Sequence, residues 1–187
     1  MAQREVHLDS RQIKVLAHPL RFRLLGHLRI DGPATATRLA QALDTNTGAT
    51  SYHLRQLAEV GLVLEEVRPS TGRERWWRAA HDSSSWQRDN FAGDADATAA
   101  ADWLEGSWLR SFVERAEAWQ RAEAAAPPEW RQATSFADFW LDLSAEQLEA
   151  LNAELYAVLE RYRAAGAGPD ARQIAYYLYG LPRVDPS

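Results

Sequence analysis

The strongest constraint on the fold is a series of four short helical patterns followed by two β-type runs, all within residues 10–79. In each helical pattern apolar residues recur every three or four positions, and turn residues separate the patterns. The β-type runs flank a glycine-containing turn at 68–72 and predict a hairpin. The predicted helices are Ser10–Ala17, Pro19 to the Asp31-Gly32-Pro33 turn, Thr35–Leu43 and Asn46–Val60, and the β-type runs are 62–67 and 73–79.

The second half of the chain has a different pattern. Residues 83–96 contain Ser83-Ser84-Ser85 and Gly93-Asp94-Ala95-Asp96 and predict a linker. A long helix is expected over 97–126, before Pro127-Pro128. Alternation predicts a strand over 134–143, and a run rich in Tyr, Leu and Ile predicts another over 173–181. Between them, Ser144 and Gln147 form a capping box for a helix that extends to about Arg163. The apolar residues expected on the buried side of that helix are Leu148, Leu151, Leu155, Val158, Leu159 and Tyr162.

These elements predict a mainly α protein with small β elements. The expected organisation is a domain of four helices and a hairpin over 1–82, a linker over 83–96, and an α+β C-terminal domain over 97–187, whose long helix is expected to mediate dimerisation. The sequence has no apolar run long enough to cross a bilayer, no apolar signal segment near its start and no cysteine. We therefore expect a cytoplasmic protein without disulfides or thiolate metal sites.

Charge is distributed unevenly along the chain. Residues 1–82 hold 12 Lys and Arg against 9 Asp and Glu, a net charge of +3, whereas residues 83–187 hold 9 against 17, a net charge of −8. Such an asymmetry favours a nucleic-acid-facing part joined to an acidic part. The whole-chain charge of −5 favours the alternative that the protein is an interaction adaptor without DNA binding.

The fourth helical pattern carries the residues expected to contact DNA. Once its apolar side is assigned to the core, small or hydrogen-bonding residues remain near its N-terminal end, and no Asp or Glu occurs from Thr45 to Ala58. An acid-free face suits a surface that approaches phosphates, and an arginine there can bind a guanine edge or a phosphate. The candidates are Thr47, Gly48, Ser51, Tyr52 and Arg55, with Arg68, Arg73 and Arg75 around the hairpin tip.

Four motifs in this order resemble the ArsR-type winged helix-turn-helix regulators. They are Leu16-Ala17-His18-Pro19-Leu20-Arg21, Tyr52-His53-Leu54-Arg55-Gln56-Leu57, Glu59-Val60-Gly61-Leu62-Val63 and Gly72-Arg73-Glu74-Arg75-Trp76-Trp77, and the resemblance covers about residues 10–80. It implies a homodimeric, sequence-specific transcription regulator, expected to be a repressor. Residues 46–60 would lie in the major groove and the wing, about 62–79, at the minor groove. Gly48 departs from the polar residue often found at its position.

Other functions have little support in the sequence. Many ArsR-type relatives sense metals through Cys or His, but this chain has no Cys and no His after His81, so we expect no metal site and no cofactor. No nucleophile elbow, phosphate-binding glycine loop or acid–base pair indicates an enzyme. His18, His27 and His53 are interpreted as scaffold residues. The aromatic residues of the second half are compatible with a core and dimer interface or with a pocket for a small apolar effector.

Overall fold

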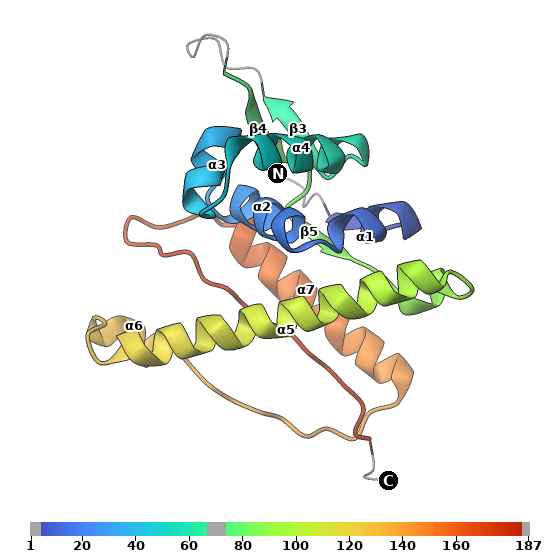
Figure 1. Cartoon of the computed structure of the whole chain (residues 1–187). Coiled ribbons are helices and arrows are strands. Elements are labelled where there is room, and N and C mark those ends of the chain that lie inside the picture. The colour runs from blue at the N-terminus through green and yellow to red at the C-terminus, as the bar shows by residue number, and fades with distance from the viewer. Residues whose placement is uncertain (1–4, 67–73, 185–187) are drawn as a thin grey trace. The chain divides into compact units, whose positions relative to one another are not determined.

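A computed structural model describes residues 5–66 and 74–184, which form two compact units, residues 2–110 and residues 111–187 (Figure 1). The first unit contains four short helices, two small sheets and the first part of a long helix. The second contains the rest of that helix, two further helices and extended segments. The protein is mainly helical with small β elements, as the sequence predicts.

The four predicted N-terminal helices are all present, with ends within two residues of the expected ones. They are α1 (Ser10–Leu16), α2 (Pro19–Ile30), α3 (Ala36–Ala42) and α4 (Thr47–Glu59). At each start a capping side chain accepts a hydrogen bond from a backbone N–H of the first helical turn. The capping residues are Asp9, His18, Thr35 and Asn46, in the order of the helices. These caps satisfy donors that the first helical turn leaves free, so the boundaries are encoded locally.

The two wing strands, β3 and β4, pair with a third strand in a small antiparallel sheet of order β2-β4-β3. It consists of β2 (Ala34–Thr35), β3 (Val63–Glu66) and β4 (Trp76–Ala79). Val63 pairs with Ala79 and Glu66 pairs with Trp76, which confirms the predicted hairpin. The hairpin tip at 67–73, with Arg68 and Arg73, lies outside the described residues.

Both tryptophans of β4 are buried. Trp76 and Trp77 are each 5% exposed. Trp77 belongs to the hydrophobic core. Trp76 points to the opposite face, where the guanidinium carbon of Arg38 lies 4.8 Å from the centre of its ring. One face of β4 is therefore covered by the hydrophobic core, and Arg38 lies over the other.

Residues 83–96, predicted as a linker, contribute instead to the first unit. Strand β5 (Ser83–Ser85) pairs in parallel with β1 (Glu5–His7). A short 3-10 helix, η1 (Arg88–Phe91), follows and places Phe91 in the core, where it is only 1% exposed. Neither element has enough residues for a periodic sequence pattern, because β5 is three residues long and η1 is a single turn.

Helix α5 (Ala95–Glu123) confirms the predicted long helix and begins two residues earlier than expected. Its first half packs on the core of the first unit through Ala97, Ala101 and Leu104, all at most 1% exposed. No helix among the described residues is both long and apolar enough to cross a membrane.

The second unit is less regular than predicted. After α6 (Pro128–Ala133), residues 134–143 are extended but belong to no sheet, and the same holds for residues 173–181. The α+β expectation for this part is therefore wrong for the residues that the structure describes. Helix α7 (Ala145–Ala164) has the predicted capping box of Ser144 and Gln147, but none of its side chains is buried. Alternation and helical spacing showed which side chains share a face, but not whether that face is covered.

Candidate nucleic-acid interface

The start of α4 is fixed by Asn46, whose Oδ1 accepts the backbone N–H of Ala49 at 2.8 Å. Gly48 lies beside this cap. A Cβ at Gly48 would lie 3.3 Å from Asn46 Oδ1, closer than most side chains tolerate. The departure of Gly48 from a polar residue therefore has a local steric reason, and it leaves the first turn of α4 open to an approaching ligand.

The predicted contact residues lie on one accessible face of α4. Thr47, Gly48, Tyr52 and Arg55 are exposed, and Ser51 is half-buried. On the opposite side Thr50, Leu54 and Leu57 are fully buried. The helix therefore has one face anchored in the core, and the other face presents hydroxyl groups and a guanidinium without a neighbouring carboxylate on residues 45–58.

A groove runs alongside this face and joins three elements. Hydroxyl-bearing residues come from the start of α3 and from α4, and charged residues come from α4 and from the end of the wing that leads into β4. The lining residues are Thr35, Ala36, Thr37, Thr47, Ser51, Arg55, Glu74, Arg75 and Trp77. Thr47, Ser51, Arg55 and Arg75 were predicted from the sequence, and the structure brings these four together.

Arg75 is held in place by two neighbours. Its Nε lies 3.0 Å from Oε1 of Glu65 on the adjacent strand, and its guanidinium carbon lies 5.8 Å from the centre of the Trp77 ring. Both charged side chains are about half exposed, so the ion pair is screened by water and weak. Glu65 and Glu74 also lower the positive charge of this side of the groove, which the alternation of the sequence did not reveal.

The sequence reasoning missed the contribution of α3. Thr35 caps α3 by accepting the N–H of Arg38 at 3.3 Å, and Thr37 is exposed in its first turn. Two threonines around a helix N-terminus were the signal that could have found this region, because backbone N–H groups there attract anions. Arg38, exposed above Trp76, adds a cation on the same helix.

Behind the exposed face, two histidines support Tyr52. The rings of His18 and His53 lie 4.4 Å apart, and the Tyr52 ring meets His53 edge-on at 5.1 Å. His18 Nδ1 accepts the N–H of Leu20. Burial, with His18 and Arg21 adding like charge, lowers the pKa of His53 below its ordinary value, and burial followed by Arg21 lowers the pKa of His18. This geometry supports the interpretation of both histidines as scaffold residues.

The histidines and carboxylates that the structure describes do not cluster as metal ligands do. Within residues 5–66 and 74–184, no group of three or more His, Asp or Glu side chains is arranged to hold a metal ion.

Comparison with known proteins identifies the same region. The family described as "Helix-turn-helix domain" matches residues 16–66. No curated protein is similar enough to be identified as a relative of the chain.

Among solved structures, a possible transcriptional regulator for arsenical resistance is 29% identical, with 64% of this chain and 98% of that chain covered and a TM-score of 0.34. An ArsR family transcriptional regulator is 24% identical, with 59% and 88% covered and a TM-score of 0.32. A mutant MarR from E. coli, complexed with operator DNA, is 16% identical, with 80% and 84% covered and a TM-score of 0.33.

The domain match covers α2, α3, α4 and β3, and of these elements α3 and α4 line the groove. Residues 16–66 thus match a helix-turn-helix domain, and the β-hairpin formed by β3 and β4 completes the predicted winged helix-turn-helix arrangement.

Proposed function

We propose that the protein is a homodimeric transcription regulator that binds specific sequences in double-stranded DNA and acts as a repressor. The observation that carries the proposal is the accessible, acid-free face of α4 within a matched helix-turn-helix domain. One helix face must be anchored while the other enters the major groove, and α4 satisfies both requirements.

Within this proposal the residues of α4 have different roles. Arg55 lies far enough along the helix to reach a base edge, where a guanidinium can bind guanine with two hydrogen bonds. Thr47 and Ser51, at the groove, bind phosphate or base oxygens. Tyr52, 52% exposed and backed by His53, contacts the DNA backbone. Thr37 and Arg38 extend the phosphate contact to α3.

The wing has a complementary role at the minor groove. Arg75, with Arg68 and Arg73 as the further predicted arginines, supplies positive charge to a groove whose narrow stretches concentrate negative potential. The ion pair with Glu65 is exposed, so Arg75 can exchange this partner for a phosphate at little cost.

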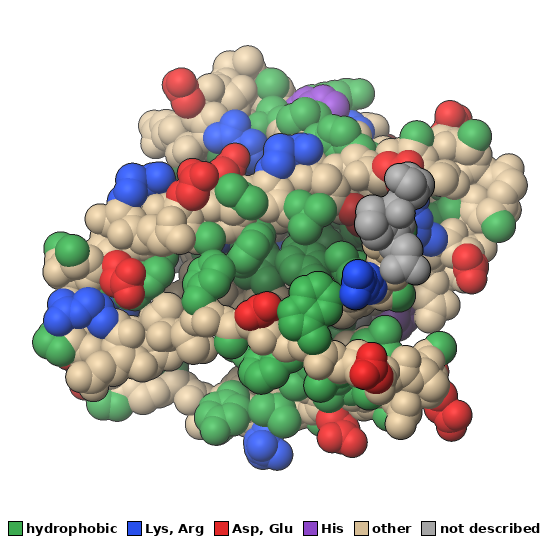
Figure 2. Space-filling model, turned by 90° about the horizontal axis from the view of Figure 1, so that it is seen from below, with side chains coloured by type: hydrophobic (Ala, Val, Ile, Leu, Met, Phe, Trp, Pro, Cys, Tyr) green, Lys and Arg blue, Asp and Glu red, His purple; other side chains and the backbone are tan. Residues whose placement is uncertain are grey.

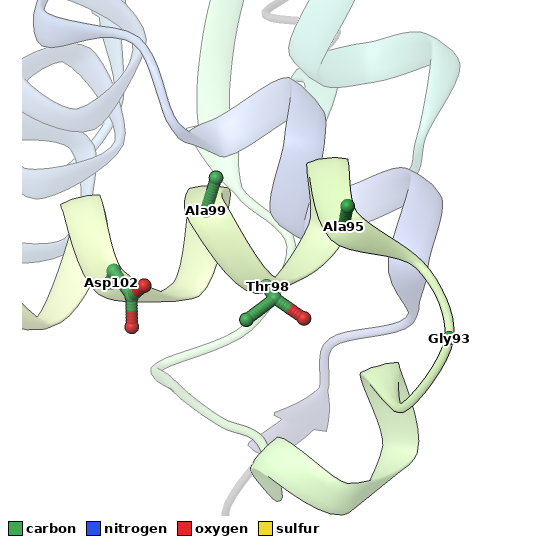
Figure 3. A pocket seen from close by; sticks show the side chains of 5 residues that line it. All are labelled: Gly93, Ala95, Thr98, Ala99 and Asp102. Atoms are coloured by element: carbon green, nitrogen blue, oxygen red, sulfur yellow. The ribbon is translucent and has the colours of Figure 1, made fainter.

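Helix α5 is the proposed dimer interface. Residues at alternating spacings of four and three along it are Ala95, Ala99, Asp102, Gly106, Leu109 and Val113. All of them except Gly106 are exposed, and all except Asp102, which pairs with Arg88, are small or apolar. Leu109 and Val113 are 48% and 49% exposed. Figure 3 shows that Ala95 and Ala99, in the first turns, present only methyl groups, which permits a close approach of a second helix. A repeat of this kind is typical of paired helices.

The test is a DNA-binding titration with genomic fragments selected by the protein, followed by fluorescence anisotropy at several salt concentrations. Specific binding should weaken steeply with salt. Replacing Arg55 by Ala should cost about 1–3 kcal/mol and relax the sequence preference if the arginine contacts a base. Arg11→Ala, an exposed arginine at the start of α1, is the matched control and should bind normally.

Two results would contradict the proposal. Absence of duplex binding at low salt would favour the adaptor alternative, and wild-type affinity of Arg55→Ala would mean that α4 does not read bases. A small apolar effector stays a prediction. The aromatic group of Phe112, Tyr177 and Tyr179, with ring centres 5.0–6.3 Å apart, is the place to look for it by ligand-induced changes in fluorescence.

A further inference from the structure

The C-terminal unit exposes an unusual amount of apolar surface. Seven aromatic side chains of residues 134–184 are between 46% and 82% exposed, namely Phe136, Phe139, Trp140, Tyr156, Tyr162, Tyr176 and Tyr179. Figure 2 shows hydrophobic side chains exposed among charged ones on the face that it presents. Neither α6 nor α7 buries a single residue. A soluble protein rarely leaves so large a hydrophobic patch uncovered.

Helix α7 carries an ordered part of this surface. Leu148, Leu151, Leu155, Val158 and Tyr162 are separated by alternating steps of three and four residues, which places them in one stripe along the helix. Leu155, Val158 and Tyr162 are 36%, 39% and 73% exposed. Their spacing is the one at which a second helix packs lengthwise, and within the described part of the chain no side chain covers them fully.

We propose that a second copy of this chain covers the stripe, with the two α7 helices packed antiparallel across the two-fold axis of the dimer. This inference rests on the proposed dimer and extends its interface beyond α5. It does not depend on DNA binding.

The charges of α7 favour an identical, antiparallel partner. The first half of the helix carries Glu146, Glu149 and Glu154, whereas the last turn carries Arg161 and Arg163. If two copies pack antiparallel with Leu155 near the axis, Glu149 of one copy lies within one helical turn of Arg163 of the other. A parallel pair would instead place like charges side by side, which is unfavourable. Arg163 is half exposed beside Glu160 and is free to rearrange.

The exposed area also fits this partner. An aromatic side chain buries roughly 150–250 Å² when fully covered, so the seven exposed ones offer on the order of 700–1,200 Å². A stable interface buries about 800 Å² on each partner. One further copy therefore accounts for the uncovered surface. The extended segments 134–143 and 173–181 supply most of these aromatic residues and would flank the α7 pair.

The experiment measures the oligomeric state of the full chain by sedimentation velocity over a range of concentrations. The variant Val158→Glu places a charge in the stripe at a position that is already accessible in one copy, so it leaves the single chain intact. It should raise the dimer dissociation constant at least about tenfold, because the carboxylate would be buried without a partner. The matched control is Ala157→Glu, an exposed alanine on the opposite face of α7, which should dimerise normally.

Charge reversal provides a second test that does not depend on packing. Glu149→Arg should weaken the dimer about two- to fivefold, and adding Arg163→Glu should restore it, since an exposed pair contributes little but has a defined sign. Wild-type dimerisation of Val158→Glu would overturn the α7 inference. If Val113→Glu on α5 still disrupted the dimer, the proposed α5 interface would stand. A wild-type chain that is monomeric at every concentration would refute both.

Discussion

The role of residues 83–96 in the first unit can be tested through Phe91. Its side chain is 1% exposed and belongs to the same core as Ile13 and Leu104. Burial of about 200 Å² of aromatic surface, at about 25 cal/mol per Å², corresponds to roughly 5 kcal/mol as an upper bound. Truncation to alanine leaves a cavity, and such changes cost about 3–5 kcal/mol.

The assay is urea unfolding of the full chain, followed by far-UV circular dichroism and tryptophan fluorescence at one fixed protein concentration. With a slope of about 2 kcal/mol per molar urea, Phe91→Ala should lower the midpoint by about 1.5–2.5 M. Phe91→Leu, which retains much of the volume, should lower the free energy of unfolding by about 1 kcal/mol and keeps the test usable if the alanine variant is unfolded.

Asn90 is the matched control, because its side chain is exposed and its backbone N–H donates a hydrogen bond to the carbonyl oxygen of Gln87. Asn90→Ala should change the free energy of unfolding by less than about 0.5 kcal/mol. If Phe91→Ala unfolded at the wild-type urea concentration, the segment would be a linker and the assignment of its aromatic ring to the core would be refuted.

Two further predictions concern the scaffold of α4. Because the pKa of His53 is lowered by burial, His18 and Arg21, the unfolded chain binds protons first as the pH falls through the ordinary histidine pKa of about 6.5. The free energy of unfolding should therefore decrease below this pH, and His53→Gln should reduce the decrease, while an equal decrease would exclude this histidine. Gly61→Ala should lower the free energy of unfolding by about 1–2 kcal/mol, because φ at Gly61 is +72°. Gly26→Ala should raise it by about 0.5–1 kcal/mol, because Gly26 lies within α2 and has open space around a new Cβ. Equal effects of the two changes would contradict this argument from backbone conformation.

The sequence predicted the helix boundaries well because their signals are local. Helix caps at Asn46 and Ser144, the stop at Gly61 and the spacing of leucines each act within a few residues, and the structure has these elements where they were expected. By contrast, the assignment of strands over 134–143 and 173–181 depended on partners elsewhere, and alternation alone cannot supply them.

The candidate site follows the same rule. Thr47, Ser51 and Arg55 could be placed on one face because helical periodicity determines which residues share a face. The pairing of Arg75 with Glu65 depends on the register between two strands, and the participation of Thr37 depends on how α3 packs against α4. Neither follows from spacing along the chain.

The parallel pairing of β1 with β5 has a practical consequence for anyone who expresses this protein. Backbone hydrogen bonds join residues 5–7 to residues 83–85, which precede α5, so the two ends of the helix-turn-helix unit are connected. Removing residues 5–7 would remove strand β1 and its pairing with β5, and would weaken the packing around the start of α5. An affinity tag at that end therefore needs a spacer.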